Sequence, residues 1–198
     1  MHSGLLHYLS AIMKSLILAS MLIGGIIMAT PQKETMIFDF KNSDSLKPWQ
    51  IINDTVMGGV SESSLRAGGN GTALFTGTVS LKNYGGFCST SSRENKNYDF
   101  SSSRGIEVHV RGDGKTYKLT LKTDTSFNGY AYQFSFATRK DQWVSVKAPF
   151  KDFIARFRGT TMPDAPPVKI SEIKSFGFLL GDKQEGPFSL EIEWMRAY

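Results

Sequence analysis

The chain has 198 residues, of which 40% are hydrophobic and 21% are charged, a composition typical of a globular protein. Its formal net charge of +5 comes without any run of Lys or Arg, which argues against nucleic acid as a partner. The single cysteine, Cys88, excludes an internal disulfide and a zinc site built from several thiolates.

The first predicted element is an apolar segment close to the N-terminus. Residues 15–29 carry no charged side chain, follow Lys14 and end in Ala29. A basic residue, a short apolar core and a small final residue are typical of a secretory signal peptide. We therefore expect residues 1–29 to be a signal peptide or, if uncleaved, an N-terminal membrane anchor. The protein is then expected to be exported, to the periplasm or the extracellular space, with Met13 as an alternative start.

From residue 36 onward, short segments alternate between apolar and polar residues and are bounded by Gly, Asn, Asp or Ser. Period two is the pattern of a half-buried antiparallel strand. Roughly nine or ten such segments, with no amphipathic helix beyond a turn or two, predict an all-β jelly-roll β-sandwich. The clearest segments are residues 73–81, with Phe75, Val79 and Leu81 inward; 106–111, with Ile106, Val108 and Val110; 116–123, with Tyr117, Leu119 and Leu121; 132–136, with Tyr132, Phe134 and Phe136; and 188–194, with Phe188, Leu190, Ile192 and Trp194.

One long segment departs from this alternation. Residues 148–171 contain four of the chain's seven prolines, and we expect them to form an ordered crossover loop. The irregular spacing of Phe150, Phe153 and Phe157 indicates that these rings close one end of the sandwich.

The histidines of the chain give little support to an enzymatic function. His109 is the one histidine after residue 29, and it lies in mid-strand on the polar face, where a solvated side chain is expected. The chain has no Gly-x-Ser-x-Gly elbow and no His-Glu-x-x-His helix, and Cys88 lacks a neighbouring histidine to activate it. We expect no catalytic residue, no metal site and no cofactor.

Three aspartates, Asp54, Asp113 and Asp182, lie near glycines at predicted strand ends. Asp beside Gly is common turn chemistry, because Asp bonds its own backbone and Gly accepts a positive φ. Two alternatives stay open at this point. Converging oxygens could bind calcium, and two of the carboxylates, if about 5–10 Å apart across a cleft, could hydrolyse a glycoside.

The pair Gly58-Gly59 lies in the stretch NDTVMGGVSES, residues 53–63. No lysine follows at the spacing of a phosphate loop, so a tight corner that borders a binding site is the better interpretation, with Met57 as a flexible apolar plug. A second pair, Gly85-Gly86, marks another strand junction. The aromatics Trp49, Tyr84, Tyr130 and Trp143 could form a platform for sugar rings, although core packing is the simpler expectation.

Five segments, in order along the chain, resemble the complex I intermediate-associated protein family, whose best-known members are mitochondrial assembly factors for NADH:ubiquinone oxidoreductase. The similarity covers residues 36–198 and includes the unusual motif Asp-x-Val-Met-Gly-Gly-x-Ser. The segments are WQIINDTVMGGVSES (49–63), ALFTGTVSLKNYGGFCS (73–89), GIEVHVRGDGKTYKLTLKT (105–123), PFKDF-x-x-x-FRG (149–159) and SFGFLLGDKQEGPFSLEIEWMRAY (175–198).

The resemblance implies a galactose-binding-domain-like fold over residues 36–198 and a non-catalytic binding or assembly role. Its motif positions mark a candidate binding edge at Asp54, Met57, Gly58, Gly59, Ser61, Gly85, Gly86, Asp113 and Tyr117. We predict a monomer that binds a protein partner, such as a respiratory membrane complex, through an apolar patch left uncovered. The alternative is an exported carbohydrate-binding module with a glycan ligand. An export signal differs from the mitochondrial location of the best-known members.

Overall fold

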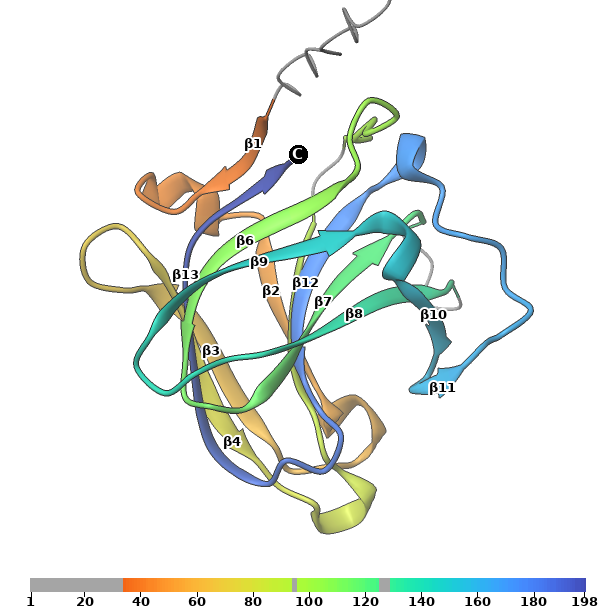
Figure 1. Cartoon of the computed structure of the whole chain (residues 1–198). Helices are drawn as coiled ribbons and strands as arrows, with labels where there is room; N and C mark the ends of the chain where they lie inside the picture. Colours follow the sequence, from red (N-terminus) through yellow and green to blue (C-terminus); the bar gives the residue numbers. More distant parts are fainter. Residues whose placement is uncertain (1–33, 94–95, 125–128) are drawn as a thin grey trace, which may run out of the picture. The chain divides into compact units, whose positions relative to one another are not determined.

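Alternating side chains build two antiparallel sheets that pack face to face (Figure 1). The computed structural model describes residues 34–93, 96–124 and 129–198. The first sheet has the order β3-β4-β13-β6-β9, with β1 paired to β13, and the second has the order β11-β10-β8-β7-β12-β5-β2. The predicted all-β, two-sheet sandwich is confirmed.

The strands of the first sheet are β1 (Thr35–Asp39), β3 (Glu62–Ala67), β4 (Ala73–Val79), β6 (Gly105–Gly112), β9 (Trp143–Pro149) and β13 (Gly186–Ala197). Those of the second sheet are β2 (Trp49–Asn53), β5 (Cys88–Ser92), β7 (Thr116–Lys122), β8 (Ala131–Ala137), β10 (Ile154–Phe157), β11 (Thr160–Thr161) and β12 (Ser175–Leu180). Short 3-10 turns complete the described elements: η1 (Ser43–Leu46), η2 (Asp54–Met57), η3 (Lys82–Tyr84), η4 (Phe150–Asp152) and η5 (Ile170–Glu172).

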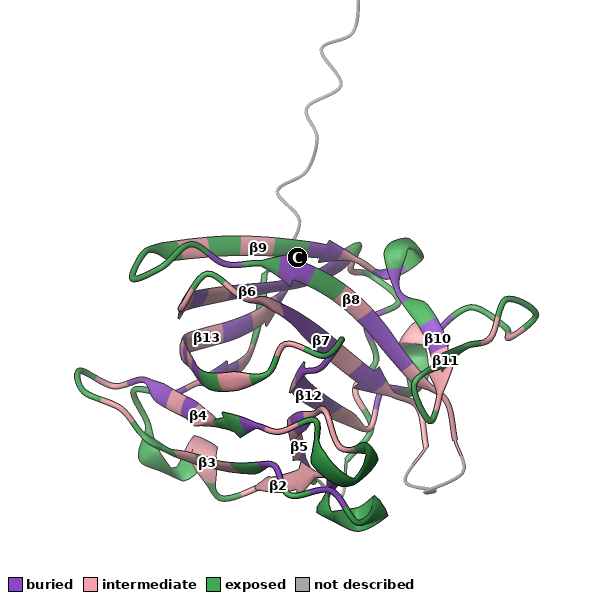
Figure 2. Cartoon of the chain, turned by 90° about the horizontal axis from the view of Figure 1, so that it is seen from below, coloured by how far each residue is buried: buried purple, intermediate pink, exposed green. Residues whose placement is uncertain are grey.

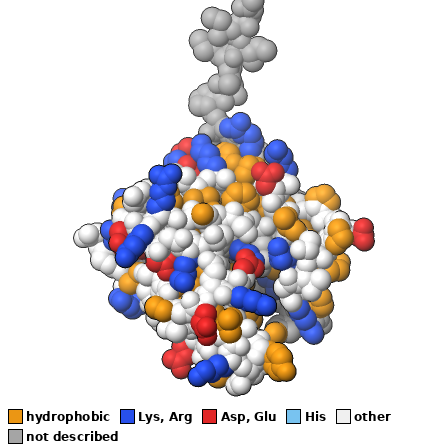
Figure 3. Space-filling view, turned by 60° about the horizontal axis from the view of Figure 1, so that its bottom comes forward, with side chains coloured by type: hydrophobic (Ala, Val, Ile, Leu, Met, Phe, Trp, Pro, Cys, Tyr) orange, Lys and Arg blue, Asp and Glu red, His pale blue; other side chains and the backbone are white. Residues whose placement is uncertain are grey.

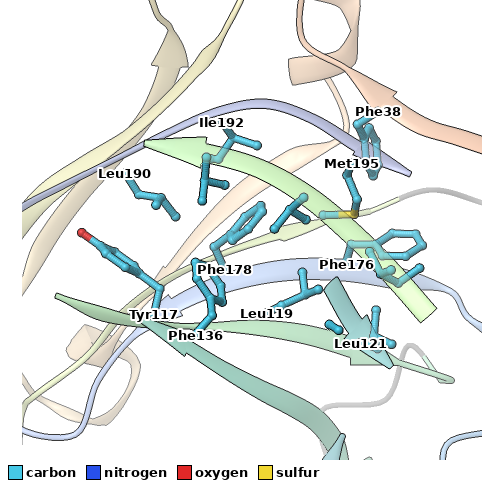
Figure 4. Close-up of a cluster of buried hydrophobic side chains, with 14 of the residues drawn as sticks. Phe38, Tyr117, Leu119, Leu121, Phe136, Phe176, Phe178, Leu190, Ile192 and Met195 are labelled. Atoms are coloured by element: carbon cyan, nitrogen blue, oxygen red, sulfur yellow. The ribbon is translucent and has the colours of Figure 1, made fainter. Parts of the chain in front are cut away.

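The core lies between the two sheets, where the predicted inward faces meet (Figure 4). In β6, the side chains of Ile106, Val108 and Val110 are fully buried, as their alternation predicts. In Figure 4, Tyr117 and Phe136 of the second sheet approach Leu190 and Ile192 of the first. Figure 2 shows buried positions concentrated on the facing strands and exposed ones on edge strands and turns.

A bulge in β13 overturns one sequence prediction. The pairing of β13 with β6 shifts between Ile192 and Trp194, so the alternation changes phase there. As a result Met195 is buried in the core, while Trp194 lies on the outer face and stacks on His109, with ring centroids 5.4 Å apart. The predicted inward position of Trp194 is therefore wrong, whereas Leu190 is buried as expected.

Two further expectations need correction. Leu81 is exposed, because β4 ends at Val79 and the next residues turn away from the core. Segment 148–171 is more regular than a loop, since it contains η4, β10, β11 and η5. Within it Phe150 and Phe153 are buried as predicted, but Phe157 is only half-buried.

The two ends of the sandwich differ in what they carry. Figure 1 shows β1 and the C-terminus at one end and the turns η2 and η3 together at the other, at the bottom of the view. The predicted signal or anchor at residues 1–29 lies outside the described residues. Within the described ranges, no helix combines the length and the apolar character needed to cross a membrane.

Candidate binding site at the Asp54 corner

Two turns meet at the lower end of the sandwich in Figure 1, and together they form what we call the Asp54 corner. The first is segment 54–61, which joins β2 to β3, and the second is segment 80–87, which joins β4 to β5. These segments hold the two Gly-Gly pairs that the sequence singles out. The corner therefore joins motifs from separate parts of the chain.

A single buried carboxylate links the two turns. Oδ1 of Asp54 accepts a hydrogen bond from the Ser61 amide at 2.9 Å, and Oδ2 accepts one from the Ser61 hydroxyl. Oδ2 also accepts bonds from the amides of Gly86, at 2.6 Å, and Phe87, at 3.3 Å. The Ser61 hydroxyl in turn accepts a bond from the Ser80 amide at 2.9 Å. Asp54 is thus bonded to both segments at once.

Close packing around this carboxylate explains why glycine occupies positions 59 and 85. A Cβ added at Gly59 would lie 2.4 Å from Cγ of Asp54, and one added at Gly85 would lie 2.6 Å from its Oδ2. Gly58 has a different role, because its φ of 91° ends η2 in the left-handed region that glycine adopts without strain. The predicted tight, glycine-built corner is what the structure contains.

The environment of Asp54 favours its ionised form. Burial by itself raises the pKa of this carboxyl, but the hydrogen bonds from Ser61, Gly86 and Phe87 outweigh burial and hold the pKa below its usual value. Because both oxygens are already occupied by protein donors, Asp54 is a structural group and a poor general base.

The outer side of the corner is apolar and open to solvent. Tyr84 is 98% exposed and Met57 is 63% exposed, and Val56, Val60 and Leu81 are exposed as well. Met57 is therefore no plug, contrary to the sequence interpretation. In Figure 3, where this end of the molecule comes forward, hydrophobic side chains are interspersed with charges of both signs. Several large apolar side chains exposed on two neighbouring turns are a feature of interaction sites.

The turn that carries Tyr84 is strained. Tyr84 has a φ of 60°, in the left-handed region that bulky residues rarely occupy, and it follows Asn83, whose residue type tolerates its φ of 54°. The Gly85 amide closes this turn on the Lys82 carbonyl at 2.9 Å. Such backbone strain persists only where the surroundings impose it, and it tends to occur at functional sites.

Asp113 and Tyr117, also placed on the candidate edge, belong to a separate network. The Tyr117 hydroxyl donates to Asp113 Oδ1 at 3.0 Å, and the Ser189 amide donates to Asp113 Oδ2 at 3.1 Å. Tyr117 is fully buried, and burial followed by the charge of Asp113 raises the pKa of its phenol. This network fixes the β6–β7 turn to β13 and presents no side chain of Tyr117 to a ligand.

The other predicted candidates are also engaged. Asp182 pairs with Lys118 at 2.5 Å, and His109 stacks between Trp143 and Trp194 while its Nδ1 lies 2.7 Å from Glu193. Burial raises the pKa of the Cys88 thiol to about 11, so it is no nucleophile at neutral pH.

The proposed aromatic platform does not assemble. Trp49 packs against Phe38, Phe40 and Phe178 of the core, and its indole nitrogen has no partner in the described structure. Trp143 stacks on His109 and is covered by Arg111, whose guanidinium lies 5.2 Å from the ring centroid. Tyr130 meets Tyr132 edge-on, and Tyr84 lies apart at the corner.

Sequence reasoning missed Val60, Leu81 and Asn83 as parts of the corner. Leu81 continues the alternation of the preceding strand, so its pattern predicts burial, and nothing in the sequence shows that the strand ends before it. A usable signal is the position of apolar residues beside both Gly-Gly pairs, outside any regular strand.

A pocket of about 250 Å³ lies between β10 and the proline-rich segment 162–168, and of its lining residues only Lys151 is charged. Over residues 34–93, 96–124 and 129–198, no three His, Cys, Asp or Glu side chains come together in a way that could hold a metal ion.

Comparison with known proteins identifies related sequences over most of the chain. A sequence model of the family described as complex I intermediate-associated protein 30 matches residues 38–192. The mitochondrial protein of that name from Mus musculus is 30% identical over 187 residues, which cover 84% of this chain and 57% of the mouse protein. The Drosophila melanogaster protein is 28% identical over 191 residues, which cover 86% of this chain and 64% of the fly protein. The chain spans less than two thirds of either relative.

Solved structures share the fold at low sequence identity. A family 11 carbohydrate-binding module from a cellulase of Clostridium thermocellum superposes with a TM-score of 0.63 and 16% identity, over 84% of this chain and 95% of that module. An agarase superposes with a TM-score of 0.58 and 14% identity, over 84% of this chain and 24% of the agarase. These likenesses bear out the predicted galactose-binding-like sandwich and extend to the fold alone.

Replacing Asp54 by Asn should destabilise the protein by about 2–4 kcal/mol at pH 7, because charge-assisted bonds are lost and an NH₂ group meets N–H donors. Folding lowers the pKa of Asp54, so the ionised carboxylate stabilises the folded protein at pH values above the unfolded-state pKa, near 3.9. This stabilisation is lost as the pH falls through the lower pKa of the folded state. The difference between wild type and Asp54→Asn in urea unfolding should therefore shrink below about pH 4. The exposed control Asp164→Asn should change stability by less than about 0.5 kcal/mol. An equal effect of both substitutions would contradict the structural role of Asp54.

Replacing Gly59 by Ala should cost about 1–3 kcal/mol, because the new methyl group would overlap the Asp54 carboxylate. Gly69 is the matched control, since nothing lies within 4 Å of a Cβ added there. Thermal unfolding of the two variants should separate them clearly. Similar melting temperatures for both would show that the corner is loose.

Proposed function

The chain belongs to the complex I intermediate-associated protein 30 family, and from that premise we propose that it is a non-catalytic module that binds a protein partner through the Asp54 corner. The observation that carries this proposal is the set of exposed apolar side chains on two turns that a buried network holds in place. Because the turns are fixed before binding, little conformational entropy is lost when a partner covers them.

A protein is the partner that best matches this surface. Tyr84 offers a large amphipathic side chain, and Tyr is enriched among the residues that dominate protein interfaces. Met57 adds a flexible apolar contact that adapts to the shape of a partner. The corner is built of projecting turns, whereas small-molecule sites are concave, and the sequence has no basic run to suit nucleic acid.

A non-catalytic role is supported by the engagement of the candidate catalytic groups. The carboxylates of Asp54, Asp113 and Asp182 all accept bonds from protein donors. A glycosidase needs one carboxyl free to protonate the leaving group and another free to act as base or nucleophile. These three groups serve as turn and network residues instead.

The names of the relatives suggest the class of partner. The mouse and fly proteins are named for association with complex I intermediates, and we infer that this chain, acting as a monomer, binds a subunit or assembly intermediate of a respiratory membrane complex. The relatives are mitochondrial by name, and nothing in the comparisons supports the export predicted from residues 15–29. Cell fractionation would test that location separately.

The double substitution Met57→Ser and Tyr84→Ser should reduce capture of the partner at least tenfold, because it removes two apolar contacts from the centre of the corner while leaving the Asp54 network intact. The matched control is Met36→Ser with Ile154→Ser, two residues that are 52% and 49% exposed and lie outside the corner. The measurement is affinity capture of respiratory-complex subunits from native membranes. Loss of capture in the control, or equal capture by both variants, would contradict the assignment.

A further inference from the structure

The outer face of the second sheet carries two rows of residues, polar and apolar, that the strand register aligns. Core-facing residues alternate with these positions, so the rows lie on the side away from the core. One row runs across six strands: Gln50, Ser91, Gly177, Thr120, Gln133 and Ile154. The adjacent row is Ile52, Ser89, Leu179, Lys118 and Ser135. We call the two rows together the Gln133 face.

The centre of the Gln133 face is more buried than its ends. Gln133 is only 9% exposed and Lys118 only 5%, although both side chains lie on the outer side of the sheet. At about 4.8 Å between neighbouring strands, the longer row extends over roughly 24 Å.

One polar group in the middle of this face has no bonding partner within the described structure. The Oγ1 atom of Thr120 is buried without a hydrogen bond, and its neighbour Gln133 is 9% exposed. The two residues are directly paired across β7 and β8. Buried polar groups are almost always hydrogen-bonded, so the unpartnered hydroxyl of Thr120 suggests a bonding group from outside the chain. Rotation of Thr120 about χ1 would turn its hydroxyl toward the open side.

The chemistry of the two rows defines the ligand class. Their one charged residue, Lys118, is neutralised by Asp182, so the face suits an uncharged ligand. Hydroxyl and amide groups both donate and accept hydrogen bonds, as sugar hydroxyls do, and Ile52 and Leu179 can contact apolar sugar surfaces. An extended peptide more often pairs with the edge of a sheet than with its face, and a single strand of nucleic acid requires a positive groove.

We propose that the Gln133 face binds a neutral oligosaccharide laid across the strands, with the hydroxyl of Thr120 and the amide of Gln133 bonding to its hydroxyl groups. This site is separate from the Asp54 corner and does not depend on the function proposed for it. It also lacks an exposed aromatic ring, so binding should be weaker than at a site where sugars stack on tryptophan.

The test is isothermal titration of the full chain with cellohexaose, xylohexaose, laminarihexaose and chitohexaose. At least one should bind, and Gln133→Ala should weaken that binding about fivefold or more. Thr120→Val should weaken it as well while preserving or raising the melting temperature, because a methyl group replaces an unpartnered buried hydroxyl. The control Ser64→Ala changes an exposed hydroxyl on β3 of the first sheet and should have no effect.

Other results would overturn the proposal. If none of the four hexasaccharides binds, the face has no role in binding neutral glycans. If a sugar binds but only Tyr84→Ser weakens it, the sugar site is the Asp54 corner. If a neutral serine-rich peptide binds more tightly than every sugar and loses affinity on Gln133→Ala, the ligand is a polypeptide.

Discussion

The buried carboxylate of Asp54 is the constraint on which the candidate site depends. It joins residues 32 positions apart in the chain, and its hydrogen bonds leave space for glycine alone at positions 59 and 85. The inner side of the corner is filled in this way, and the apolar side chains of Met57 and Tyr84 lie exposed to solvent. Their exposure would normally be unfavourable, and a partner that covers them would remove that cost. The polar interior and the apolar exterior of the corner are thus two consequences of one arrangement.

The sandwich itself is built by other forces. Its two sheets are held by side chains with period two, and the core between them would form without the corner. This separation explains why the same fold serves a carbohydrate-binding module and part of an agarase at 16% and 14% identity, since function lies in turns and faces that the core does not determine. In this chain the two surfaces that we propose for binding are the turns at one end and the outer face of the second sheet.

Local patterns predicted much of this structure, and long-range contacts account for what they missed. Alternation placed Ile106, Val108 and Val110 in the core, and the Gly-Gly pairs marked the corner. The same alternation misplaced Trp194, because a bulge changes the phase of β13 without any local sequence signal. Alternation could not show that the Gly86 amide donates to Asp54, or that the buried hydroxyl of Tyr117 donates to Asp113. Nor could it show that Thr120 and Gln133 are neighbours. Each of these contacts depends on how separate strands and turns come together.

We propose that partner proteins contact the corner that Asp54 organises. The most direct measurement is site-specific photo-cross-linking in intact membranes, with a photoreactive amino acid placed at position 84 and, in a second protein, at position 36. Both positions are exposed, but only the first lies on the corner. We expect a discrete cross-link to a respiratory-complex protein from position 84 and none from position 36. The cross-link from position 84 should be absent when Asp54→Asn is introduced in a variant that is still folded. A partner captured from position 36 alone, or equally from both positions, would contradict the proposal.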